Sequence, residues 1–237
     1  MNPLQSLLGR YDRLVILDTE TTGLSASRDE IIEFAAAVVE NREGRAAVTA
    51  QYDQLAALSP GGFVPARIEA LTGISTRDLR ERGLPKTRIC RDIGEFFQGN
   101  TLLLSYNAHF DLTFLYYLLL RSGDTAILRG KDKLDLLTVF RDRRTAPHKL
   151  RDAIRAYGLT GRVANTHRAL DDVLAALAVL EAMADEQDDL LRYVNLFGYP
   201  ARFGMEGKPI SSVTYRPQTG YPAPPLYHAA ETEPLPL

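Results

Sequence analysis

The chain has 237 residues, a net charge of −2 and a hydrophobic content of 45%, which predict one globular domain with or without an appendage. No apolar stretch reaches the ~18 residues of a membrane-spanning helix, and the charge argues against strong non-specific binding of long duplex DNA. The N-terminus lacks a secretory signal pattern. The single cysteine, Cys90, excludes an intrachain disulfide and a cysteine zinc site. We therefore expect a cytoplasmic protein with no membrane partner.

The first predicted elements are three strands with short connections, which favour antiparallel pairing. They cover residues 13–18, 29–40 and 45–52. Helices and short strands then alternate, as expected for an α/β domain. The predicted helices cover residues 65–71, 84–98, 109–121, 149–157 and 168–186, with a buried strand at 101–105 and a short strand or helix entry at 133–137.

The composition changes after about residue 188, because most of the 13 prolines lie near the C-terminus and helix signals become rare. We expect a domain over residues 1–188 and an extended, Pro-rich tail or small appendage over residues 189–237. Within this region, residues 208–218 could form one strand.

Two acidic residues, Asp18 and Glu20, close the first predicted strand. Alternate residues of a strand point to the same side, so the two carboxylates face one way. Two anions held this close repel each other unless a cation lies between them, and a divalent cation with oxygen ligands is the simplest one. A solvated strand end would explain an isolated pair better, so the interpretation depends on partners elsewhere in the chain.

Further acidic residues open two of the predicted helices. Asp111 lies in a first helical turn, within the motif NAHFD, and Asp172 lies early in the last helix, five residues after His167. Each position alone is explained by an acid that complements the helix dipole. Together, however, the acids lie at strand ends and helix starts, where an α/β sheet gathers its functional groups.

These acids could converge on one crevice. Four carboxylates in one place require about two divalent cations, and a neighbouring histidine can serve as a general base near neutral pH. This equipment suits metal-assisted phosphodiester hydrolysis, with two metals ~3.5–4 Å apart. The candidate residues are Asp18, Glu20, Asp111, His167 and Asp172.

The three motifs D-x-E-T-T-G, N-x-x-F-D and H-x-x-x-x-D, in this order, resemble the DEDD exonucleases of the His subtype. The proofreading epsilon subunit of bacterial DNA polymerase III belongs to that family. The segments DEIIEFAAAVV, LTGIS and HKLRDAIRAYGL between the motifs add to the resemblance, which spans about residues 12–185.

The resemblance implies a ribonuclease-H-like fold, with a mixed central sheet and flanking helices, and a 3′→5′ exonuclease that releases nucleoside 5′-monophosphates. Asp18, Glu20 and Asp172 would bind two divalent cations, Mg²⁺ or Mn²⁺, with Asp18 bridging them. Asp111 would bind the second metal, and His167 would deprotonate the attacking water.

The resemblance also implies contacts to the substrate. Thr21 and Thr22 belong to a turn that would meet the 3′-terminal nucleotide, and Leu24 would wedge against its base. Phe110 would stack on that base or belong to the core, and stacking tolerates any sequence. Asn107 would position the backbone of the site or touch the substrate.

Several other polar segments have structural and functional interpretations. Asp135 could support the site from behind or serve in a turn. His109 is expected at the surface or rim. Residues 141–144 (RDRR) are expected on a solvated face, with a phosphate-contacting rim as the alternative. Residues 187–193 resemble peptides that bind sliding clamps, although they are also explained as the end of the last helix.

The leading hypothesis is a metal-dependent exonuclease acting on single-stranded 3′ ends, with DNA favoured over RNA. One alternative is an RNA-trimming enzyme of the same fold. Others are a non-catalytic binding module, or a subunit that works only within a DNA polymerase complex and is tethered by its tail. All the candidate acids and His167 are present, which argues against a decayed site.

Overall fold

The computed structural model describes residues 2–228. Its elements, in chain order, are α1 (Gln5–Arg10), β1 (Arg13–Thr21), β2 (Ile31–Arg42), β3 (Arg45–Leu55), α2 (Ala66–Thr72), α3 (Thr76–Arg82), α4 (Lys86–Phe96), β4 (Thr101–Ser105), α5 (Ala108–Ser122), η1 (Thr125–Leu128), β5 (Asp132–Asp135), α6 (Leu136–Arg143), α7 (Leu150–Ala156), α8 (Ala169–Glu186), η2 (Leu190–Tyr193), β6 (Leu196–Pro200) and β7 (Thr214–Gln218). In this part of the chain, no helix has both the length and the apolar character needed to cross a membrane.

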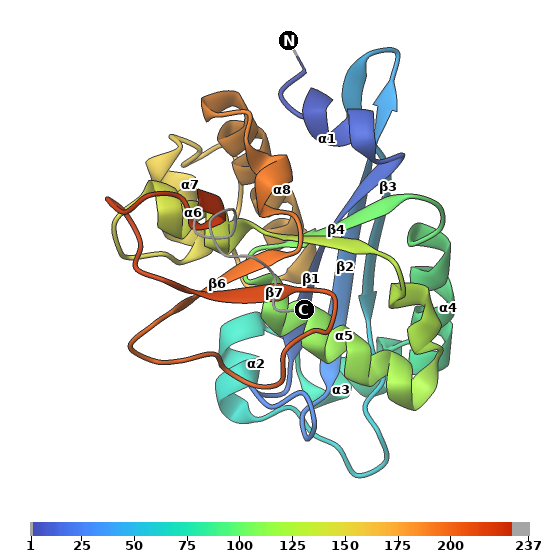
Figure 1. The fold of residues 1–237 in the computed structure, drawn as a ribbon. Coiled ribbons are helices and arrows are strands. Elements are labelled where there is room, and N and C mark those ends of the chain that lie inside the picture. The colour runs from blue at the N-terminus through green and yellow to red at the C-terminus, as the bar shows by residue number, and fades with distance from the viewer. Residues whose placement is uncertain (1, 229–237) are drawn as a thin grey trace.

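A five-stranded mixed sheet in the order β3-β2-β1-β4-β5 forms the centre of the fold (Figure 1). The first three strands pair antiparallel, whereas β4 and β5 join in parallel. One core cluster lies between the sheet and α8, and a second lies on the opposite face under α4 and α5. The predicted mixed α/β sheet with flanking helices is confirmed.

β1 is longer than predicted, so Asp18 and Glu20 belong to the C-terminal part of the strand itself. The register explains this, because antiparallel pairing with β2 continues to Thr21 opposite Ile31. Parallel pairing with β4 stops at Ile16. Beyond that point β1 is paired along one edge only, which leaves room beside the two carboxylates.

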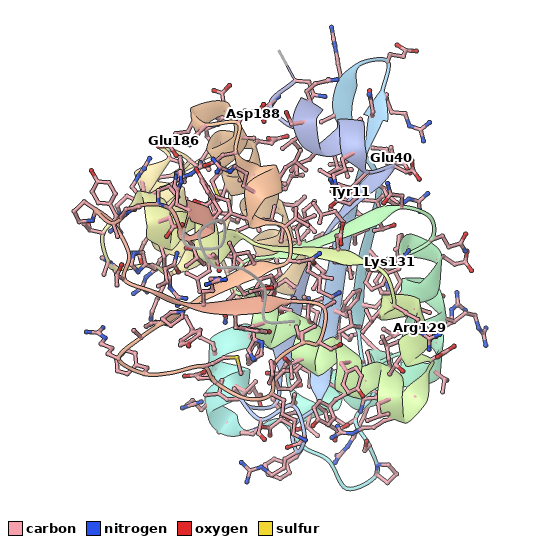
Figure 2. The ribbon with its side chains drawn as sticks, in the orientation of Figure 1. Tyr11, Glu40, Arg129, Lys131, Glu186 and Asp188 are labelled. Atoms are coloured by element: carbon pink, nitrogen blue, oxygen red, sulfur yellow. The ribbon has the colours of Figure 1, made fainter. Side chains whose placement is uncertain are left out.

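Two short helices were missing from the predicted elements. α3 carries a capping box in which Ser75 and Asp78 bond each other's backbone, a signal that is readable in the sequence. α1 is fixed by distant contacts, since Ser6 Oγ donates to Asp188, just after α8, at 2.8 Å. Tyr11 Oη, just after α1, donates to Asp132 at 2.7 Å. Figure 2 labels one residue of each contact, Asp188 and Tyr11.

The segment after α8 packs on the domain rather than extending away from it. Here β6 and β7 form a two-stranded parallel sheet. Asp142 of α6 anchors the segment, because it accepts hydrogen bonds from Tyr193 Oη, Gln218 Nε2 and the Leu226 backbone N–H. We call residues 189–228 the appendage. Residues 229–237 of the predicted tail lie outside the described residues.

Candidate active site

The alternation of β1 explains how the first two acids are presented. Leu14 and Ile16 point into the cluster beneath α8, and Val15 and Leu17 point to the opposite face. Asp18 and Glu20 continue the first series, and Thr19 continues the second. Both carboxylates are half-buried and face α8, as predicted for residues two apart on a strand.

Asp111 reaches the site from the other face of the sheet. Its Oδ1 accepts hydrogen bonds from the backbone N–H and the hydroxyl of Thr19, at 3.0 and 2.8 Å, and its Oδ2 accepts from Ser105 Oγ at 2.6 Å. The residue is only 3% exposed. These bonds hold the Asp111 carboxylate against Thr19 of β1, the residue between Asp18 and Glu20.

Asp135 fixes the start of the helix that carries Asp111. Its Oδ1 accepts from the backbone N–H groups of Asn107 and Ala108, both at 3.0 Å. The same carboxylate accepts from Leu137 and Thr138 at the start of α6. One buried carboxylate therefore caps two helices, which gives Asp135 a positioning role behind the site.

The start of α8 is held by an ion pair between buried Glu33 and exposed Arg168. Glu33 on β2 is fully buried, and it accepts from Arg168 Nε and from the Ala169 backbone N–H, both at 2.9 Å. Glu33 lies directly opposite Glu20 in the β1–β2 register. The pair therefore joins the turn before α8 to the strand next to the acids. His167, immediately before Arg168, has a left-handed backbone with φ 58°.

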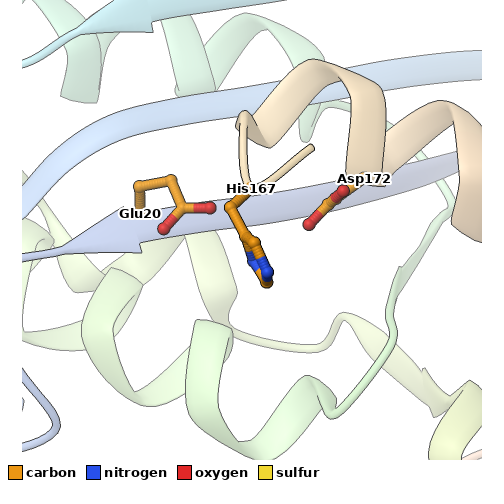
Figure 3. A group of neighbouring side chains, drawn as sticks. All are labelled: Glu20, His167 and Asp172. Atoms are coloured by element: carbon orange, nitrogen blue, oxygen red, sulfur yellow. The ribbon is translucent and has the colours of Figure 1, made fainter. Parts of the chain in front are cut away.

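The N-terminal turn of α8 presents Asp172 to β1. Asp172 is 7% exposed, and its Oδ1 accepts from Asn165 Nδ2 at 2.6 Å. Glu20, His167 and Asp172 converge on one space, as Figure 3 shows. One ligand atom from each lies within 4.8 Å of the others, close enough to hold a metal ion. His167 itself is exposed, on the open side of the group.

The acids raise one another's pKa values. Burial, and then the charges of Asp111 and Asp172, hold the pKa of Asp18 well above its usual value. Burial and the charges of Asp172, Glu33 and Asp111 raise the pKa of Glu20 to about 8. Burial also raises the pKa of Asp111 to about 7, although its hydrogen bonds oppose the shift. Bound cations would relieve this repulsion, so the donor set fits hard divalent metals.

The residues assigned to substrate contacts differ in their exposure and in their local bonds. Leu24 is 77% exposed, which suits an apolar contact to a ligand. Thr21 is buried and donates to the Gly23 carbonyl oxygen, while the Thr22 hydroxyl accepts from the Glu30 backbone N–H. Both threonine side chains therefore shape the turn. Phe110 is half-buried against Phe114, at 4.8 Å between ring centroids.

Asn107 is exposed and occupies the left-handed region, with φ 75°, at the start of α5. His109 is half-buried, as expected for a rim residue, and its ring bonds Tyr215 Oη and the Glu206 carbonyl oxygen of the appendage, each at 2.7 Å. The solvated face predicted for residues 141–144 is wrong in part. Arg143 is buried in ion pairs with Glu186 and Asp189, and Arg144 also pairs with Glu186.

Comparison with known proteins identifies the family. The family model RNase_T, described as Exonuclease, matches residues 15–180. The chain belongs to this exonuclease family. The predicted family is thus confirmed, and the matched region contains all the candidate acids and His167.

Two curated relatives from Bacillus subtilis (strain 168) are much longer than this chain. The 3′-5′ exonuclease DinG is 35% identical over 112 residues, which are 47% of this chain and 11% of DinG. A PolC-type DNA polymerase III is 38% identical over 101 residues, which are 43% of this chain and 6% of the polymerase. The chain thus spans about a tenth or less of either relative.

A solved structure supports the fold independently. E. coli Exonuclease I in complex with a dT13 oligonucleotide superposes with a TM-score of 0.67 at 21% identity. The match covers 77% of this chain and 43% of the other. It shows that the two proteins share the ribonuclease-H-like exonuclease fold.

Proposed function

We propose that this chain is a 3′→5′ exonuclease that hydrolyses phosphodiester bonds at the 3′ ends of DNA, single strands preferred, and releases nucleoside 5′-monophosphates. The observation that carries the proposal is the group formed by Glu20, His167 and Asp172, whose ligand atoms lie within 4.8 Å of one another, with Asp18 close enough to feel the charges of Glu20, Asp111 and Asp172, in a chain of the exonuclease family. DNA is favoured because the relatives include a DNA polymerase, and because E. coli Exonuclease I, which has the same fold, forms a complex with a dT13 oligonucleotide.

The carboxylates would hold two divalent cations, Mg²⁺ or Mn²⁺. Glu20 and Asp172 share one space beside β1, Asp18 feels the charges of both, and Asp111 approaches from the other face of the sheet. Their raised pKa values support this assignment, because acids held this close together need a compensating positive charge. When bound, such cations activate water and stabilise negative charge on phosphate oxygens.

We assign His167 as the general base. Its ring lies on the exposed side of the carboxylates, where water can reach it, and within 4.8 Å of ligand atoms of Glu20 and Asp172. An imidazole in this place can take the proton of the attacking water. Water is the nucleophile, so no covalent enzyme intermediate is required.

The substrate's 3′-terminal nucleotide would lie over the turn after β1. Leu24 presents an exposed apolar side chain there, and Thr21 and Thr22 give the turn its shape. The exposed part of Phe110 would stack on the terminal base. Asn107 would act through its backbone, which starts the helix carrying Asp111.

We propose that residues 1–188 form the catalytic domain, to which the appendage is added. We also propose a reducing, cytoplasmic setting, which the single buried cysteine suits.

A DNA polymerase remains a proposed partner on the strength of the PolC relative. A sliding clamp does not, because Leu190 and Tyr193 of the clamp-like segment are 3% and 1% exposed. That segment forms η2, separate from α8, which ends at Glu186.

The test compares 5′-labelled single-stranded DNA with the matched RNA, each with Mg²⁺, Mn²⁺ or EDTA. We expect a ladder of shortening DNA that disappears with EDTA. Faster shortening of the RNA would favour the RNA-trimming alternative. If the isolated chain shortens neither strand but does so after addition of a polymerase, the subunit alternative is correct.

A further inference from the structure

A second pocket lies on the outer side of α5, away from the carboxylates. Its volume is about 480 Å³, and its walls come from α5, the stretch from η1 to β5, and residues 208–212 of the appendage. Tyr116 of this pocket follows Asp111 by five residues, which is about 7.5 Å along the helix and roughly 140° around it. The appendage wall lies beyond residues 15–180, the part that matches the exonuclease family.

The pocket is lined by cations without counter-charges. Arg129, Lys133 and Lys208 all border it, and no Asp or Glu does. Within residues 2–228, none of these three side chains forms an ion pair with a carboxylate. Arg129 projects from the stretch after η1, as labelled in Figure 2. An anion in the pocket would therefore meet three cationic side chains and no lining carboxylate, although Asp132 acts on Lys133 from outside the pocket.

Lys133 is the one of these three cations whose charged group is held in place by hydrogen bonds within the protein. It is 3% exposed, and its Nζ donates to the Lys131 carbonyl oxygen and to Ser212 Oγ, each at 2.7 Å. An ammonium has three N–H donors, so one is left for a ligand. Ser212 accepts from Lys133, which leaves its own hydroxyl proton free to donate. A buried ammonium that forms no direct ion pair is costly, and an anion in the pocket would offset the part of that cost that the nearby charge of Asp132 does not.

Tyr116 adds a flat apolar surface to the charges. It is 45% exposed and packs edge-on against Tyr117, with an interplanar angle of 84°. Exposed aromatic rings beside cations are typical of sites that stack a base and bind its phosphate. The volume also lies within the range of small-molecule sites.

We propose that this pocket binds a nucleotide through its phosphate and base. The source is either an internal nucleotide of the strand being shortened or a free nucleoside monophosphate. The strand version rests on the proposed function, whereas the mononucleotide version does not. In both, Lys133 and Ser212 bind the phosphate, Arg129 and Lys208 add charge at the rim, and Tyr116 stacks on the base.

The test measures binding in EDTA, where no hydrolysis is expected, so that it is independent of activity. Anisotropy of a 5′-fluorescein oligothymidylate of about 20 nucleotides reports strand binding, and calorimetry with dTMP reports mononucleotide binding. The pocket variant Arg129→Gln/Lys208→Gln changes two exposed side chains. The matched control, Arg45→Gln/Arg91→Gln, removes the same charge from two exposed positions that do not line the pocket.

We expect the pocket variant to bind the oligonucleotide roughly tenfold more weakly, with a salt slope smaller by about 1.4, because each phosphate contact contributes about 0.7 on a single strand. Tyr116→Ala should weaken binding about fivefold, the lower end of base stacking.

Loss of strand binding without any dTMP binding would assign the pocket to the strand. dTMP binding that the pocket variant abolishes would assign it to free nucleotide. If the pocket and control variants bind both ligands equally well, the proposal is wrong, even if the enzyme is active.

Discussion

Arg168 is expected to stabilise the site by neutralising Glu33, and the variant Arg168→Met tests this. The change leaves a fully buried carboxylate opposite Glu20, in a cluster that already carries Asp18, Asp111 and Asp172. Removing one partner of a buried pair typically lowers the free energy of unfolding by 3–5 kcal/mol. The Arg168 side chain is 46% exposed, so we expect about 3 kcal/mol, which corresponds to roughly 9 °C in Tm for a domain of this size.

A double-mutant cycle separates charge from packing. Glu33→Gln removes the buried charge, so Arg168→Met should be far less harmful in that background than in the wild type. Urea denaturation of the four proteins at pH 7 in EDTA measures the coupling. A loss of less than about 0.5 kcal/mol for Arg168→Met, or equal losses in both backgrounds, would refute the reasoning.

Three other predictions follow from the same geometry. The pKa of Glu20 is about 8 in the folded protein and 4.5 for a free glutamate. Between these two pH values, the folded protein therefore binds more protons than the unfolded chain. In EDTA, Tm should therefore fall as the pH rises from 5 to 8, and Mg²⁺ or Mn²⁺ should reduce the fall; a flat profile in EDTA would contradict the account. His167→Ala should lower kcat by about 10²–10⁴-fold while oligonucleotide binding in EDTA stays unchanged, and a near-normal kcat would remove His167 as the base. Asp135→Ala uncaps α5 and α6 and should lower the free energy of unfolding by about 3 kcal/mol; an unchanged urea midpoint would deny its capping role.

The sequence predicts the positions of the acids of the candidate site because these acids lie on regular helices and strands. Strand alternation predicts that Asp18 and Glu20 face one way, and helix starts predict the places of Asp111 and Asp172. The sequence does not predict where β1 ends, because that depends on where its pairing with β2 and β4 stops. Pairing between distant segments leaves little trace in one sequence.

The support of the site was missed for the same reason. Glu33 and Arg168 are 135 residues apart. A single acid in the apolar run IIEFAAAVV does signal that a buried partner is needed, but it does not say which one. The prolines after residue 188 left both an extended tail and a small appendage open. Buried anchors such as Tyr193 and Gln218, which bond Asp142, hold the appendage on the domain.

The most direct test of the central proposal is the polarity of degradation of a single-stranded DNA labelled at either end, by the wild type and by Asp18→Asn, with Mg²⁺ or Mn²⁺. The account predicts that a 3′ label is released at once as a mononucleotide, that a 5′ label appears in a descending ladder, and that Asp18→Asn does neither. Release of the 5′ label first, internal cuts, or equal activity in Asp18→Asn would contradict it.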